Sequence, residues 1–247
     1  MKVDLKSIIL AGVPQTDVTI SDGRVIKLRA FLVKELKLLM LAKEGGSEDK
    51  MILQVMQQCV LTEGVDVEML PAFDIETMYL QLYMLSKGSS IVDVSFVCQN
   101  EVDGKICGHK VGTRVNLKTI KLDKDINSDN LIKVNGDMTL EMRYPSVLEQ
   151  EYFAAVKTVE QAAAKLIDMC LNCVKKINVK DQTLIVGEDI HKEELGELME
   201  LVSGDVFEKI TKFIENTPML HTHLALKCSK CGHEEAVELR GLADFFD

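Results

Sequence analysis

The chain has 247 residues and a net charge of −10, with 39 acidic against 29 basic side chains, which argues against nucleic-acid binding through phosphate neutralisation. Tryptophan is absent and aromatic residues make up 5%, so few side chains could stack on single-stranded bases. No apolar run reaches the roughly 18 residues of a membrane span, and Met1–Lys6 lacks an apolar signal core, so we expect a cytosolic protein that contacts no membrane.

The first ninety residues predict a β-hairpin followed by helices. Alternating apolar residues in Lys2–Leu10 and Asp17–Leu28 favour strands, with a turn at Ser21–Gly23. Apolar residues at helical spacing then predict three helices: one ending at Gly45-Gly46, one following Ser47, and one from Asp74 as N-cap to Lys87-Gly88. Each helix has an apolar face, so we expect the three to pack together.

The middle of the chain is predicted to be rich in strands. Ile91–Val97 leads directly into Cys98, and Lys110–Leu117 follows Cys107. Asp103-Gly104, between the two cysteines, is a hairpin signal. Further strands are predicted at Val115–Leu122, Leu131–Val134 and Met138–Tyr144, with Asn135-Gly136 as a second hairpin turn between the last two.

Helices return after Tyr144-Pro145. Ser146 and Glu149 have the form of a capping box, and they predict one long helix through Phe153 and Cys170 that ends near Lys175-Lys176. The remaining elements are predicted as strands at Ile177–Val179 and Thr183–Val186, helices at His191–Leu201 and Val206–Asn216, and strands at Leu220–Leu226 and Glu234–Leu239.

These elements predict an α+β fold of mixed helices and antiparallel hairpins. We expect four segments: an N-terminal hairpin with helices (1–89), a β-rich segment (90–145), a helical segment (146–219) and a C-terminal hairpin (220–247). The last segment is expected to pack back on residues 90–118, because each carries one half of a cysteine motif.

The two halves are Cys98-x8-Cys107-Gly-His and Cys228-x2-Cys231-Gly-His, each flanked by strand-like runs. A cytosol disfavours disulfides, and seven cysteines cannot all pair. Two hairpins that each offer two thiolates are typical of a split zinc ribbon, so we predict a structural zinc held by Cys98, Cys107, Cys228 and Cys231. Two alternatives stay open: reduced buried thiols, or a site in which His109 or His233 replaces a cysteine.

The other candidate residues favour a structural interpretation. Cys59, Cys170 and Cys173 lie on apolar helical faces and are expected in the core. Phosphate-loop, dinucleotide-binding, serine-hydrolase and zincin motifs are all missing from the sequence, so we predict that the chain is not an enzyme. His221 and His223 alternate on a predicted strand and could bind a metal, which leaves a metalloenzyme as a further alternative.

The order of these features is similar to that of a known family. The N-terminal hairpin, the helices bearing Phe31–Glu35 and Cys59, the segment Asp74–Leu80 and the late Cys-x2-Cys-Gly before Phe245-Phe246 resemble baseplate hub and hub-assembly proteins of contractile-tailed, T-even-like phages. The resemblance covers most of the chain. It implies a minor hub subunit or a chaperone of hub assembly, in the host cytoplasm during assembly or in the virion tail baseplate.

The resemblance also implies other baseplate and tail hub proteins as partners, and homo- or hetero-oligomers, because hub parts meet around a symmetry axis. Leu242, Phe245 and Phe246 form an apolar chain end, which either packs into its own core or anchors in a partner. The competing class is a zinc-ribbon adaptor of a host or phage transcription or translation complex.

Overall fold

The computed structural model describes residues 4–45, 48–126, 129–155, 158–241 and 244. The chain divides into two compact units, unit 1 from residues 1–67, 73–123 and 219–247, and unit 2 from residues 68–72 and 124–218. Both units combine helices with antiparallel strands, so the predicted α+β class is confirmed. Among the described residues, no helix is both long enough and apolar enough to cross a bilayer.

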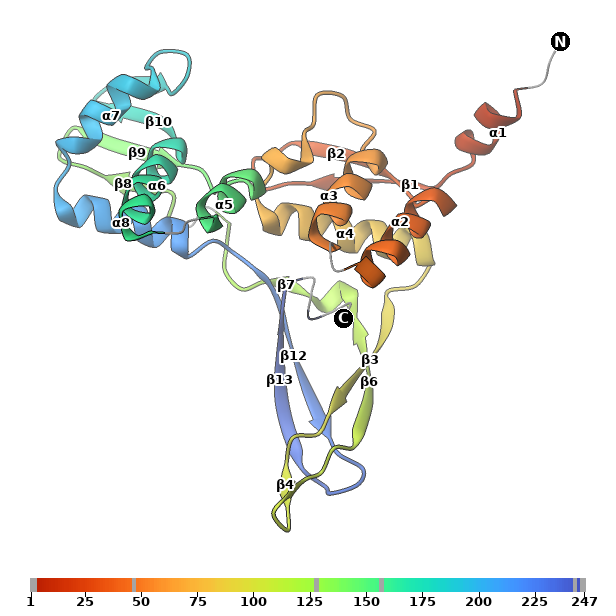
Figure 1. Ribbon diagram of the computed structural model, residues 1–247. Coiled ribbons are helices and arrows are strands. Elements are labelled where there is room, and N and C mark those ends of the chain that lie inside the picture. Colours follow the sequence, from red (N-terminus) through yellow and green to blue (C-terminus); the bar gives the residue numbers. More distant parts are fainter. Residues whose placement is uncertain (1–3, 46–47, 127–128, 156–157, 242–243, 245–247) are drawn as a thin grey trace. The chain divides into compact units, whose positions relative to one another are not determined.

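Unit 1 begins with a helical layer on a β-hairpin (Figure 1). Its strands are β1 (Gln15–Thr19) and β2 (Val25–Arg29), and its helices are α1 (Leu5–Ala11), α2 (Val33–Gly45), α3 (Glu48–Cys59) and α4 (Ala72–Lys87). A 3₁₀ turn, η1 (Val67–Met69), precedes α4. Ile26 and Leu28 of the hairpin, Met56 of α3 and Phe73 of α4 are almost completely buried, so both the hairpin and the helices contribute to the core.

Two longer hairpins extend from this layer within unit 1 (Figure 1). One joins β3 (Ile91–Val97) to β6 (Lys110–Asn116), with the small hairpin β4 (Glu101–Val102) and β5 (Lys105–Ile106) between them. The other joins β12 (Leu220–Lys227) to β13 (Glu234–Arg240), and β7 (Lys121–Leu122) pairs with the start of β12. A second 3₁₀ turn, η2 (Leu117–Thr119), links β6 to β7.

A shared core holds the two long hairpins together at their base. Its buried members come from α4, β6, η2 and the residue after η2, β12 and β13: Leu80, Val115, Leu117, Ile120, Leu220 and Leu239. Since the C-terminal hairpin packs on residues close to the first hairpin, segments about a hundred residues apart in sequence form one body.

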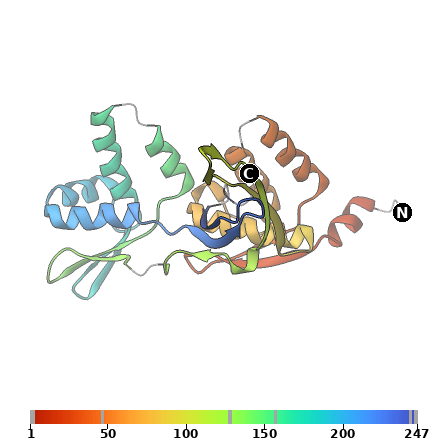
Figure 2. The ribbon, with the colours of Figure 1, turned by 90° about the horizontal axis from the view of Figure 1, so that it is seen from below.

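Unit 2 is a four-stranded antiparallel sheet with helices on one face (Figures 1 and 2). The sheet order is β11-β10-β9-β8, from β8 (Leu131–Lys133), β9 (Met138–Met142), β10 (Val174–Val179) and β11 (Gln182–Ile185). The helices are α5 (Val147–Ala154), α6 (Val159–Asn172), α7 (Lys192–Glu200) and α8 (Gly204–Glu215). Leu140, Ile177, Leu195 and Ile210 fill the space between sheet and helices.

Three predicted elements were wrong. A strand was predicted at Lys2–Leu10; its first two residues lie outside the described residues, and from Leu5 on the chain forms helix α1. Leu5, Ile8 and Ile9 follow helical spacing, and Asp4 caps the first turn by accepting from the Ser7 N–H. The single helix predicted after Ser146 is two helices, since Thr158 caps α6 anew. Lys175 and Lys176 belong to strand β10 rather than to a helix end.

The third difference concerns the predicted strand at Val115–Leu122, which η2 interrupts. The Asn116 side chain accepts from the Lys118 N–H and caps this turn. Asp74, predicted as an N-cap, lies within the first turn of α4 and reaches back to the β1–β2 turn, where it accepts from the N–H and the hydroxyl of Ser21. For Asp74, a long-range contact thus replaced the local role that its residue type suggested.

A buried ion pair fixes the start of α2 against β2. Arg29 donates to both carboxylate oxygens of Glu35, at 2.9 and 3.3 Å, and Glu35 is fully buried. Burial favours the neutral acid, but hydrogen bonds from Arg29 and the Leu32 N–H outweigh it and hold the pKa of Glu35 below its ordinary value. The pair therefore stabilises the fold at neutral pH, and this contribution is lost as the pH falls from about 4.3 through the lower folded-state pKa.

Replacing Glu35 by Ala leaves the Arg29 guanidinium buried without its carboxylate. We expect the free energy of unfolding at neutral pH to fall by about 3–5 kcal/mol, measured by urea unfolding. Asp93→Ala is the matched control, because its pair with Arg114 is exposed and should contribute little. Equal costs for the two substitutions would contradict this account of the buried pair.

Candidate metal centre

The four predicted cysteines meet at the far ends of the two long hairpins of unit 1 (Figure 1). Cys98 follows β3 and Cys107 precedes β6, while Cys228 follows β12 and Cys231 precedes β13. The sulfur atoms of all four lie within 4.8 Å of one another. Each hairpin therefore contributes two thiols from its turn, as the sequence motif predicted.

The two cysteine turns have the same backbone geometry. In the first, the Cys98 N–H donates to the His109 carbonyl at 2.9 Å, and the Gly108 N–H donates to the Cys98 carbonyl at 3.0 Å. In the second, the equivalent bonds are Cys228 to His233 at 2.8 Å and Gly232 to Cys228 at 2.9 Å. The two motifs thus build two copies of one knuckle.

Both knuckles need a glycine after the second cysteine. Gly108 has a φ of 63° and Gly232 a φ of 75°, in the left-handed region where a side chain would be strained. This backbone turn lets the chain reverse directly behind the second thiol of each pair. The Cys-Gly-His signature therefore reflects a conformational requirement as well as a ligand.

The longer first motif keeps this geometry because its extra residues form a hairpin of their own. The Cys107 N–H donates to the Asn100 carbonyl at 2.8 Å, which closes the turn as if Asn100 and Cys107 were adjacent. The six residues between them are the β4–β5 hairpin, whose Asp103 and Gly104 have φ values of 52° and 73°. Without this insertion, the first motif would be Cys-x2-Cys-Gly-His, like the second.

The spacing of the sulfurs suits a tetrahedral metal site. Cys98 Sγ lies 3.7 Å from Cys231 Sγ, and Cys107 Sγ lies 3.8 Å from Cys228 Sγ. Four sulfurs at about 2.3 Å from one ion lie about 3.8 Å apart, whereas a disulfide bond measures about 2.05 Å. The group is therefore four free thiols with the separation that metal coordination requires.

The electrostatics of the group also favour a bound cation. The backbone N–H of His233 lowers the pKa of Cys231 to about 6, and that of Cys231 lowers the pKa of Cys228. For Cys98, the N–H of Asn100 acts in the same direction, but burial and the neighbouring thiols raise the pKa to about 12. Four adjacent thiolates repel one another, so without a positive ion they cannot all ionise at neutral pH.

The histidines of the two motifs lie outside the four-sulfur group. His109 Nε2 and Ser229 Oγ are 2.9 Å apart and form a hydrogen bond between the two knuckles. Lys230 Nζ donates to the Cys107 carbonyl at 3.1 Å, a second bond between the knuckles. These contacts join the two turns independently of any metal.

The other three cysteines are buried in the core, as expected. Cys59 lies on α3, and Cys170 and Cys173 lie at the end of α6, all with no exposed surface. Burial raises the pKa of Cys59 and of Cys170 to about 11, and that of Cys173 to about 12. Protonated thiols without access to water are poor ligands and poor nucleophiles.

The predicted interface residues Leu242, Phe245 and Phe246 lie outside the described residues. Next to them, Asp244 accepts a hydrogen bond from the Arg240 N–H at 2.8 Å.

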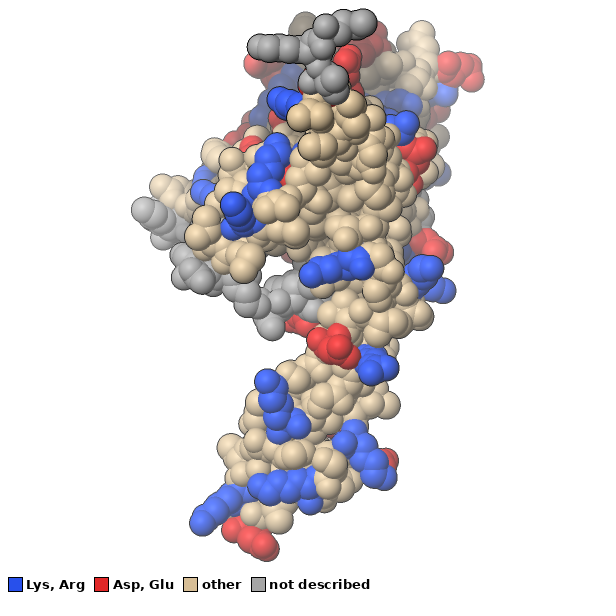
Figure 3. Space-filling model, turned by 90° about the vertical axis from the view of Figure 1, so that its right-hand side faces the viewer, with Lys and Arg blue, Asp and Glu red and all other residues tan. Residues whose placement is uncertain are grey.

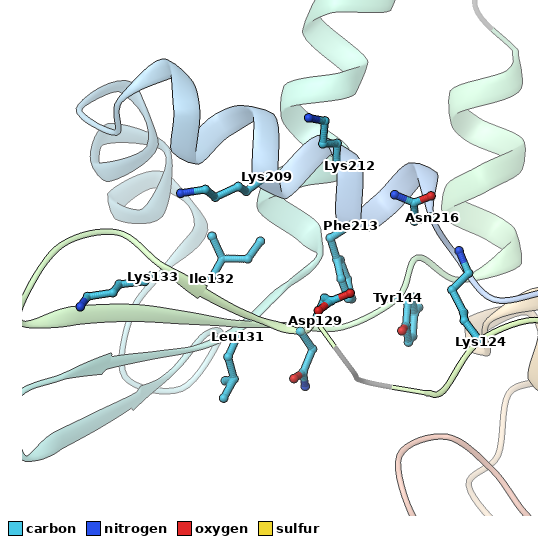
Figure 4. A pocket seen from close by; sticks show the side chains of 11 residues that line it. Lys124, Asp129, Leu131, Ile132, Lys133, Tyr144, Lys209, Lys212, Phe213 and Asn216 are labelled. Carbon is cyan, nitrogen blue, oxygen red and sulfur yellow. The ribbon is translucent and has the colours of Figure 1, made fainter.

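A pocket of about 570 Å³ in unit 2 gave no signal in the sequence (Figure 4). The stacked rings of Tyr144 and Phe213 line it, together with four lysines: Lys124, Lys133, Lys209 and Lys212. Lys209 and Lys212 pair with Asp205 and Glu208 of their own helix. The lysine nitrogens are spread around the rim rather than directed at one point, so the pocket is not a formed anion site.

Fold and site together define an α+β protein in which two hairpins present a four-thiol centre able to hold a metal. The chain belongs to the T4 bacteriophage base plate protein family, whose model matches residues 13–247. It is similar to "Baseplate hub assembly protein gp26" of Enterobacteria phage T4, with 23% identity over 225 residues, 91% of this chain and 94% of the relative. No solved structure matches the chain. The family resemblance inferred from the sequence is thereby confirmed.

Proposed function

We propose that this chain acts, without catalysis, in building the central hub of a phage tail baseplate. The observation that carries the proposal is the nearly full-length correspondence with a hub assembly protein, 91% of this chain against 94% of the relative. Both chains are covered almost from end to end. The similarity therefore extends over the whole of this protein and is not limited to a single shared domain. Its partners are then other baseplate and tail hub proteins.

The four-thiol centre is proposed to hold a structural zinc ion. Cys98, Cys107, Cys228 and Cys231 would fill all four coordination positions, whereas a catalytic zinc keeps one open for water or substrate. The sulfur separations of 3.7 and 3.8 Å support this assignment. The ion would supply charge neutralisation for the thiolates and hold the two hairpin ends together.

Replacing Cys231 by Ser should release the zinc and lower the melting temperature by several degrees, because a three-thiol site binds zinc more weakly and metal binding stabilises the folded state. Zinc per chain by elemental analysis and thermal unfolding are the two measurements. Cys170→Ser is the control, since it changes a buried thiol in unit 2 and should leave the zinc content unchanged. A Cys231→Ser chain that keeps its full zinc content and its melting temperature would contradict the assignment of a structural zinc to the four thiols.

Two forms of the hub role remain to be separated by experiment. A minor structural subunit stays in the virion tail baseplate, whereas an assembly chaperone acts in the host cytoplasm and leaves. Quantitative mass spectrometry of this chain in purified particles and in the lysate distinguishes them. We expect a few copies per particle for a subunit, and presence in the lysate alone for a chaperone. A further test uses phage that is blocked before tail assembly. If the chain is as abundant in that lysate as in a normal one but is bound to no hub protein, the result would contradict both forms.

The apolar chain end is the contact element that we propose for hub partners. Removing residues 242–247 deletes Leu242, Phe245 and Phe246 but none of the four cysteines. We expect capture of hub proteins from infected-cell lysate to fall at least about tenfold, as for the loss of interface anchors, with zinc content unchanged. Leu201→Ala, which removes an exposed leucine of unit 2, is the matched control. Undiminished capture by the truncated chain would show that these residues pack internally.

The zinc-ribbon adaptor receives no support from the comparisons. Figure 3 shows lysine and arginine side chains gathered on one face of the hairpins. The exposed basic residues of the two hairpins and their turns are Lys105, Lys110, Arg114, Lys227, Lys230 and Arg240. Several serve the hairpins themselves, since Lys227 pairs with Glu234 at 2.7 Å and Lys230 bonds the opposite knuckle. These contacts favour a structural use of the charges over phosphate binding.

A further inference from the structure

A second group of metal-type ligands lies at the opposite end of the C-terminal hairpin from the cysteines. His221 and His223 of β12 and Glu238 of β13 each place one ligand atom within 4.8 Å of the others. The two imidazole rings meet edge to face, with centroids 5.3 Å apart. Neither the four-thiol centre nor the proposed hub role uses these residues.

The strand register explains why the three side chains converge. Residues two apart on a strand point to the same face, which places His221 beside His223. Glu238 is the direct cross-strand partner of His223, so its side chain points to that face as well. The opposite face of β12 carries Leu220 and Leu224, which pack in the shared core. The cluster therefore lies on the β13-β12-β7 sheet, on the side opposite the residues that pack in the shared core.

One ring nitrogen of the cluster lacks a partner. His221 Nδ1 is buried and makes no hydrogen bond, and it is the single such side-chain nitrogen or oxygen among the described residues. Leaving a buried polar atom unpaired destabilises a folded protein, so an unpaired atom of this kind is a candidate for binding a ligand. A cation bound through Nδ1 would give it one.

The carboxylate of the cluster pairs with an arginine through one of its two oxygens. Arg240 donates to Glu238 Oε1 at 3.0 Å. The bond engages one oxygen, and the other is available to a metal. His223 and Glu238 are exposed, so small side-chain rotations bring their ligand atoms to the roughly 3–3.5 Å spacing of ligands on one ion.

We propose that His221, His223 and Glu238 form a second site for a divalent transition-metal ion, with zinc as the ion of choice. Two imidazoles and one carboxylate suit zinc rather than magnesium or calcium, which prefer oxygen ligands alone. Three protein ligands leave at least one coordination position open, in contrast to the closed four-thiol centre. The ion at this site exchanges with free metal ions in solution, and its binding does not depend on the cysteines.

The test is equilibrium dialysis of the full chain against zinc chloride, with zinc per chain measured by elemental analysis. We expect wild type to bind one more zinc than His223→Ala, and Glu238→Gln to weaken the second site at least about tenfold. His223 and Glu238 are exposed, so these variants should fold. Binding of the second zinc should persist in Cys231→Ser, which separates this proposal from the four-thiol assignment.

Two controls match the variants. Glu235→Gln removes a carboxylate of the same strand outside the cluster, and His191→Ala removes an exposed histidine of unit 2. Both should keep the second zinc.

Cobalt(II) gives an independent readout, because thiolate ligands produce an intense near-ultraviolet charge-transfer band that a histidine–carboxylate site lacks. Equal zinc binding by wild type, His223→Ala and Glu238→Gln would overturn the proposal.

Discussion

The closure of four thiols across the two hairpin ends is the constraint on which unit 1 depends. The sulfur contacts join residues 133 and 121 positions apart in the sequence, at 3.7 and 3.8 Å. Bringing such distant segments together costs chain entropy, which grows with the length of the closed loop. The metal ion proposed for the four-thiol centre would cross-link the hairpin tips and offset this cost. It would also join strands that, as isolated two-stranded hairpins, would be marginally stable in water.

The thiols act together with the shared core at the other end of the hairpins. Leu80, Val115 and Leu220 bury apolar surface at the base, whereas the outer parts of β3 and β6 alternate between exposed and half-buried residues and the outer part of β13 is exposed. The hairpins are thus anchored twice, by apolar packing at the base and by polar contacts at the tips.

Much of the fold was predictable because local interactions specify it. The capping box of Ser146 and Glu149 is formed, and the Asp103-Gly104 turn has the positive φ values that its residues favour. The incorrect secondary-structure predictions occurred where local signals compete. Leu5–Ala11 fits strand and helix patterns almost equally, and the new cap at Thr158 divides a segment that has uniform apolar spacing. Asp74 had the residue type of a cap, but Ser21, 53 residues away, decided its role.

The sequence by itself determined the ligand chemistry of the candidate site, since two Cys-Gly-His turns supply two thiolates each and a tetrahedral ion requires four. It also determined the turns and caps, because these depend on side chains within a few residues of one another. Only the tertiary structure decided which sulfurs are neighbours and how the β4–β5 insertion leaves the knuckle intact. It also placed Glu238 beside His223, because strand register follows from the packing of a whole hairpin on its core and not from any local pattern.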